Sequence, residues 1–158
     1  MNRQQLLAQK RKSKRLYEVE FKALRKQSLP KPFDKLGGSR VQHSGLIDVA
    51  EDSAVLFVAR DGDTLERRAF YAHWLLRTAN GLLPLAILHY HPSHKGVHLL
   101  TNCRDDRDYT ERQLPGAPEL ALNTPADIDP GAPEGRLRLV NLFCERCGIC
   151  LGPDHQLL

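Results

Sequence analysis

The sequence predicts an α+β fold: a small, mainly antiparallel sheet with one packed helix, a basic N-terminal helical arm and a C-terminal cysteine cluster. Short apolar runs separated by turn residues predict the strands, and one apolar series at helical spacing predicts the helix. The third observation is the segment CERCGIC near the C-terminus, whose thiol spacing suits a metal ion. A chain of 158 residues suffices for one compact domain with an extension, but not for two ordinary domains.

Charge divides the chain into a basic arm and an acidic body. Residues 1–35 carry a net charge of +8, whereas residues 36–158 carry −4, so the total of +4 comes from the arm. We therefore expect an arm and linker over 1–35 and a single α+β domain over 36–158. A basic extension on an acidic body is typical of a segment that seeks phosphates or an acidic partner.

The arm itself has two halves. Residues 9–15 (QKRKSKR) lack any apolar side chain, so this half should stay in solvent and reach outward. In the second half Tyr17, Phe21 and Leu24 recur at helical spacing, which predicts a docked helix ending before Pro30. A solubilising charge run, attracted by the acidic body, is the alternative to nucleic-acid contact. The candidate nucleic-acid-binding residues are Lys10, Arg11, Lys12, Lys14 and Arg15.

The first half of the body predicts two strands and a helix. After a Pro- and Gly-rich linker over 29–38, residues 41–49 are a weak strand candidate and the apolar run 54–59 is a stronger one. The turn-like sequence Arg60-Asp-Gly-Asp63 closes that run. Asp63 or Thr64 could cap a helix extending through Thr78, and Asn80-Gly81 would end it.

The second half of the body predicts a hairpin, a loop and a last strand. Residues 82–91 and 97–103 form two antiparallel strands, and the five residues between them have the length and composition of a hairpin loop. Residues 115–135 contain five prolines, three glycines and four acids but no Lys or Arg, so we expect a long surface loop. Residues 136–143 (RLRLVNLF) alternate charged and apolar side chains, which predicts a strand.

The cysteines predict a structural zinc site. Thiolates separated by two residues can reach one tetrahedral ion from a tight turn, and a glycine after the second cysteine allows the bend. The fourth ligand would be Cys103, at the end of the hairpin, or His155. An iron–sulfur cluster is a rival, but Asp154 stands where a ferredoxin-like run has its next cysteine. The predicted ligands of this zinc-knuckle-like cluster are Cys103, Cys144, Cys147 and Cys150.

Four of the seven histidines lie between positions 89 and 98. In a strand His89 and His91 face the same way. If residue 91 pairs with residue 97, His98 faces the opposite side with Tyr90. The predicted catalytic set is His89, His91, His94 and Lys95: imidazoles act as general acid and base, and Lys95 stabilises charge on a phosphate.

Two other roles for the histidines stay open. With a carboxylate such as Asp105 or Asp106, His89 and His91 could hold a catalytic zinc. Alternatively, the histidines satisfy buried polar groups or line a surface.

Three functions follow from these features. The preferred one is a zinc-stabilised protein that binds RNA or DNA through its arm and sheet. The alternatives are a histidine-based ribonuclease or phosphodiesterase, and an accessory or inhibitor factor that docks on a protein. No apolar run is long enough to span a membrane, and no apolar stretch follows the basic start as in a signal peptide, so we expect a cytoplasmic protein without a membrane partner.

Overall fold

The computed structural model describes the chain except for residues 24, 26, 93–96, 103–127 and 158. Its centre is a six-stranded antiparallel sheet with strand order β2-β3-β4-β5-β6-β7. A short 3₁₀ turn, η1 (Leu65–Arg67), connects the two central strands. The strands are β2 (Lys22–Ala23), β3 (Val41–Ala50), β4 (Ser53–Arg60), β5 (Ala69–Thr78), β6 (Gly81–Tyr90) and β7 (Val97–Thr101).

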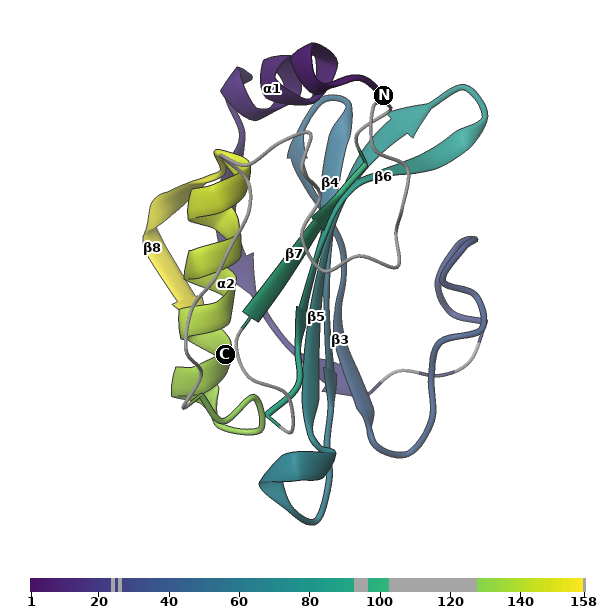
Figure 1. Ribbon diagram of the computed structural model, residues 1–158. Coiled ribbons are helices and arrows are strands. Elements are labelled where there is room, and N and C mark those ends of the chain that lie inside the picture. The colour runs from purple at the N-terminus through teal and green to yellow at the C-terminus, as the bar shows by residue number, and fades with distance from the viewer. Residues whose placement is uncertain (24, 26, 93–96, 103–127, 158) are drawn as a thin grey trace.

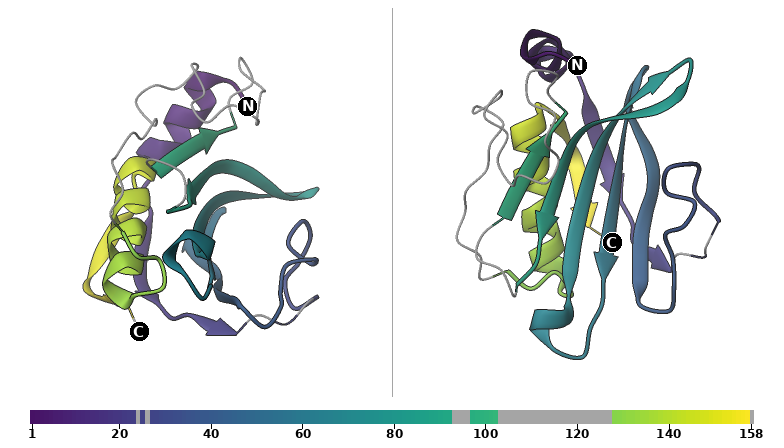
Figure 2. Two further views of the ribbon diagram at one scale, coloured as in Figure 1. Left: turned by 60° about the horizontal axis from the view of Figure 1, so that its bottom comes forward. Right: turned by 45° about the vertical axis from the view of Figure 1, so that its right-hand side comes forward.

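A second layer covers one face of this sheet (Figures 1 and 2). It contains helix α2 (Pro133–Cys147) and a parallel pair of strands, β1 (Arg15–Val19) and β8 (Cys150–Leu157). Helix α1 (Arg3–Arg11) lies across one end of the sheet, next to the turn between β3 and β4. The described residues contain two helices and a mainly antiparallel sheet, which confirms the predicted α+β class.

The main core lies between α2 and the sheet. The ring of Phe57 on β4 meets that of Phe143 on α2 edge to face, with centroids 5.8 Å apart. Trp74 is fully buried beside them and donates an indole hydrogen bond of 2.7 Å to Ser53. Large aromatic side chains supply much of the burial that stabilises a domain of this size, and a buried indole N–H needs such a partner.

The predicted helix over 63–78 is wrong, because this segment forms η1 and then β5. The two faces of β5 are both covered: Phe70, Ala72 and Trp74 face α2, whereas Leu75 joins a smaller apolar cluster on the other face. A strand that is buried on both faces loses its polar–apolar alternation, so an apolar run of this kind cannot be distinguished from a helix by period alone.

The predicted strand over 136–143 is also wrong, because these residues lie inside α2. Leu139, Val140 and Phe143 are buried at helical spacing, which the alternating charges of RLRLVNLF concealed. The helix begins at Pro133, within the predicted loop 115–135. Proline is favoured at this first position, where its missing N–H costs nothing. The rest of that loop up to residue 127 lies outside the described residues.

The arm differs from its prediction in both halves. The half over 9–15 does not reach outward, because it contains the end of α1 and the buried Lys14, and Leu6 anchors the same helix in the main core. Asn2 begins α1 with a capping box: its side chain accepts from the Gln5 N–H at 2.8 Å, and its own N–H donates to the Gln5 side chain at 2.9 Å. The predicted docked helix of the second half is wrong, because the described residues there form β1 and β2. Strand β1 buries Leu16 and leaves Tyr17 63% exposed, and Leu24 lies outside the described residues.

Neither helix in the described part of the chain combines the length and the apolar character that crossing a bilayer requires.

Candidate nucleic-acid interface and histidine face

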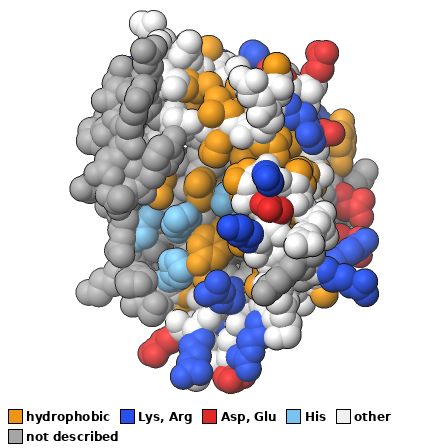
Figure 3. All heavy atoms as spheres, turned by 90° about the vertical axis from the view of Figure 1, so that its right-hand side faces the viewer, with side chains coloured by type: hydrophobic (Ala, Val, Ile, Leu, Met, Phe, Trp, Pro, Cys, Tyr) orange, Lys and Arg blue, Asp and Glu red, His pale blue; other side chains and the backbone are white. Residues whose placement is uncertain are grey.

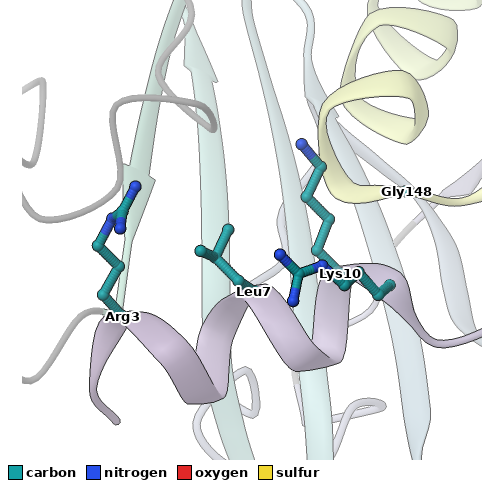
Figure 4. A pocket seen from close by; sticks show the side chains of 5 residues that line it. Arg3, Leu7, Lys10 and Gly148 are labelled. Atoms are coloured by element: carbon teal, nitrogen blue, oxygen red, sulfur yellow. The ribbon is translucent and has the colours of Figure 1, made fainter.

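The cationic groove is a surface cavity of about 490 Å³ where α1 meets the end of α2. Figure 4 shows Arg3, Leu7 and Lys10 projecting from one side of α1, as their spacing requires, with Gly148 beside Lys10. Three cations share this lining, and no Asp or Glu of the described chain belongs to it. The lining residues are Arg3, Leu7, Lys10, Arg11 and Gly148.

Gly148 allows the two helices to meet closely. It ends α2 in the left-handed conformation, with φ of +69°, and its N–H donates to the Cys144 carbonyl. A Cβ atom at this position would overlap the backbone carbonyl of Lys10. Glycine is therefore required here both by the turn and by the approach of α1, which fixes the position of the cationic groove.

The five predicted nucleic-acid-binding residues do not have equal access. Arg11, Lys12 and Arg15 are exposed and Lys10 is half-buried. The ammonium of Lys12 pairs with Asp52 at 3.2 Å. Lys14 is only 2% exposed, so its assignment to a binding surface is wrong.

Lys14 instead closes the end of α1. Its Nζ donates to the backbone carbonyls of Gln9, Lys10 and Lys12 at 2.6, 2.9 and 2.8 Å. It also lies 5.1 Å from the centre of the Trp74 ring. Burial lowers the pKa of Lys14, although the nearby Cys147 counteracts this shift. The last carbonyls of a helix lack partners within it, and here one buried cation satisfies two of them together with the carbonyl of Lys12, the residue that caps the helix.

The cysteine cluster has a different geometry from the predicted tight turn. Cys144 and Cys147 lie buried in the last turn of α2, whereas Cys150 is exposed at the start of β8. Burial raises the pKa of Cys144 to about 12. The pKa of Cys147 is raised mainly by burial and to a smaller extent by the neighbouring Cys144.

Zinc is not confirmed. Among the described residues, no group of three or more His, Cys, Asp or Glu side chains is placed to hold a metal ion. Cys103 lies outside those residues, and the side chain of His155 is not described. The zinc site stays a prediction.

Alkylation of the native protein tests the cysteine geometry. We expect iodoacetamide to modify Cys150 rapidly and to leave Cys144 and Cys147 unmodified until the protein unfolds. The reason is that the thiolate is the nucleophile and both buried thiols resist ionisation. Peptide mass mapping identifies the modified residue. If all three thiols are protected from iodoacetamide and a chelator abolishes this protection, the result would instead support the predicted zinc site.

The strand register assembles the histidine face, which is the sheet face turned away from α2. The hairpin of β6 and β7 is confirmed, but Tyr90 rather than His91 pairs with Val97. This difference of one residue moves His98 to the same face as His89, because successive strand residues point in opposite directions. One row of paired residues thus crosses five strands: His43, Val58, Tyr71, His89 and His98. His73 and His91 join the same face. Figure 3 shows histidine side chains gathered on this face.

Tyr71 contacts two of the imidazoles on the histidine face, those of His89 and His91. Its ring lies edge to face with His89 and with His91, each at 5.3 Å between centroids, and its hydroxyl is 3.4 Å from the His91 Nε2. Burial raises the pKa of Tyr71, although Arg60 opposes the shift, so the phenol keeps its proton at neutral pH. The hydroxyl can therefore donate to His91.

The buried imidazoles are neutral bases at physiological pH. Burial lowers the pKa of His73 to about 4, with a smaller contribution from His89. Burial also lowers the pKa of His89, and the neighbouring His91 and His98 lower it further. His43 shifts in the same direction, through burial and then Lys22. A neutral imidazole can accept a proton, but it does not attract a phosphate.

Of the predicted catalytic set, the structure places His89 and His91 on one face, whereas His94 and Lys95 lie outside the described residues. Catalysis stays a prediction. Sequence reasoning missed Tyr71, His73 and His43, which come from strands distant in the chain. The one local signal for a shared strand face is the two-residue spacing of Tyr71 and His73, and the incorrectly predicted helix over 63–78 concealed it.

Comparison of the chain with protein-family models, with curated proteins and with solved structures gives no match.

Proposed function

We propose that the protein binds nucleic acid through the phosphate backbone, using the cationic groove and the exposed cations beside it. The observation that carries this proposal is that Arg3, Lys10 and Arg11 line one cavity to which no acid of the described residues belongs. Arg and Lys are the side chains that most often contact phosphates, and clustered cations account for sequence-independent affinity.

The immediate surroundings favour this location over the histidine face. Within the described part of the chain neither Lys10 nor Arg11 forms an ion pair, and Arg15 is exposed nearby. The imidazoles of His73 and His89 are neutral at physiological pH and add no attraction for phosphate. The two regions are also separated. Asp52, directly before β4, pairs with Lys12 of the basic segment, whereas Val58 of β4 belongs to the histidine row. Six residues separate Asp52 from Val58, which corresponds to about 20 Å along an extended strand.

The proposal predicts salt-dependent binding. Affinity for a labelled oligouridylate and for a DNA duplex, measured by fluorescence anisotropy, should fall steeply between about 50 and 200 mM salt as counterion release weakens. Replacing Arg3, Lys10 and Arg11 together by glutamine should reduce the slope of log affinity against log salt by about one for each phosphate that the variant no longer neutralises.

A matched control separates the groove from net charge. Arg67, Arg138 and Lys35 are exposed cations elsewhere, and their combined replacement by glutamine should leave most of the affinity intact. Equal reductions of affinity in the two triple variants would contradict the proposal.

The same samples test the alternatives. Shortening of the oligonucleotide that disappears in His91→Ala would favour the phosphodiesterase. Salt-sensitive binding to a protein, with no affinity for either nucleic acid, would favour the accessory or inhibitor factor.

A further inference from the structure

A second cavity, of about 320 Å³, lies on the histidine face beneath the segment 32–36. The rings of Phe33 and His73 meet edge to face at 4.9 Å, which holds this segment against the sheet. Phe33 is 6% exposed and belongs to the smaller apolar cluster with Val58. The lining residues are Pro32, Phe33, Leu36, Val41, Val58, Arg60, Tyr71 and His73.

Among the described residues, the lining is apolar except for Arg60, Tyr71 and His73. Arg60 carries a permanent charge, Tyr71 has a protonated hydroxyl, and His73 is neutral because its pKa is about 4. Within the described residues Arg60 forms no ion pair, and no acid lines the cavity. The cavity therefore presents one uncompensated positive charge to whatever occupies it.

We propose that this cavity binds a small organic anion, with its apolar body between Phe33, Val41 and Val58 and its carboxylate on Arg60. Binding pockets for small molecules are mostly apolar, with a few polar groups that fix orientation, and this lining has that composition. The guanidinium can hold a carboxylate with two parallel hydrogen bonds. The site is separate from the cationic groove, so this inference is independent of the proposed nucleic-acid binding.

The volume of the cavity limits the size of its occupant. Its volume corresponds to about ten water molecules at about 30 Å³ each, which is enough for a phenyl ring with a short acidic chain. The segment 32–36 lies over the sheet, so the space is a pocket and not a flat surface for a macromolecule. Figure 3 looks onto this face, where histidine side chains adjoin hydrophobic ones with Lys and Arg side chains nearby.

Titration with 3-phenylpropanoate, followed by amide chemical shifts in the full-length protein, tests the proposal. We expect saturable shifts at Phe33, Val58 and His73, with a dissociation constant in the millimolar range or below. The neutral isostere 3-phenylpropanamide should bind about fivefold more weakly, the factor typical of one exposed ion pair. Arg60→Gln should abolish this preference, because it weakens binding of the acid to the level of the amide.

Two further variants make the result decisive. Arg40→Gln removes a neighbouring cation that pairs with Asp63 and should keep the preference for the acid. Val41→Phe fills the cavity and should eliminate binding of both compounds, with circular dichroism confirming that the protein stays folded. The proposal is overturned if 3-phenylpropanoate gives no saturable shifts. It is equally overturned if acid and amide bind alike, or if Arg40→Gln matches Arg60→Gln.

Discussion

Replacing Lys14 by methionine should lower the free energy of unfolding by about 3 kcal/mol or more. The buried ammonium donates to the carbonyls of Gln9, Lys10 and Lys12, and methionine would leave all three without this donor while keeping the stem over Trp74. A buried acceptor without a partner costs about 1–3 kcal/mol, and the three costs overlap because they share one donor. Urea unfolding followed by Trp74 fluorescence measures the change.

Lys12 supplies the matched control. Its ammonium is exposed and pairs with Asp52 on the surface, so Lys12→Met should cost less than about 1 kcal/mol. Hydrogen exchange should rise across α1 in Lys14→Met alone, since this cation closes the end of that helix. Equal stability of the two variants would show that the Lys14 ammonium is not a structural donor.

Acidification should destabilise the protein through the histidine face. His73 has a pKa of about 4 in the folded protein and 6.5 as its ordinary value. Between these two values the unfolded chain binds a proton that the folded protein excludes, so stability falls as the pH is lowered. His73 alone should remove about 3 kcal/mol between pH 6.5 and about 4. The lowered pKa values of His89 and His43 act in the same direction.

The variant His73→Leu isolates this effect. Leucine keeps an apolar contact with Phe33 but cannot titrate, so the dependence of unfolding free energy on pH should flatten in this window. Urea unfolding at several pH values above about 4.5 avoids the titration of most carboxyl groups. If the unfolding free energies of His73→Leu and of the original protein fall equally as the pH is lowered, the prediction is contradicted and the imidazole of His73 is not buried in the folded protein.

The parts of the fold that the sequence predicted correctly are those with strong local signals. The apolar run 54–59 became β4, and the hairpin of 82–91 and 97–103 became β6 and β7, because turn residues bracket each strand. The helix predicted over 63–78 and the strand over 136–143 were wrong because both segments satisfy two periods at once. Contacts with distant segments then decide, and neither segment contains that information.

Local patterns of charge, turn residues and apolar runs are enough to predict the class of the fold, the basic character of the N-terminal segment and the hairpin that carries His89. Three features depend on contacts between distant segments: the burial of Lys14, the meeting of α1 and α2 at Gly148, and the common face of His89 and His98. Side-chain direction in a strand reverses with every residue, so one step of register changes which groups meet. Burial, charge pairing and pKa then follow from neighbours that lie far away in the chain.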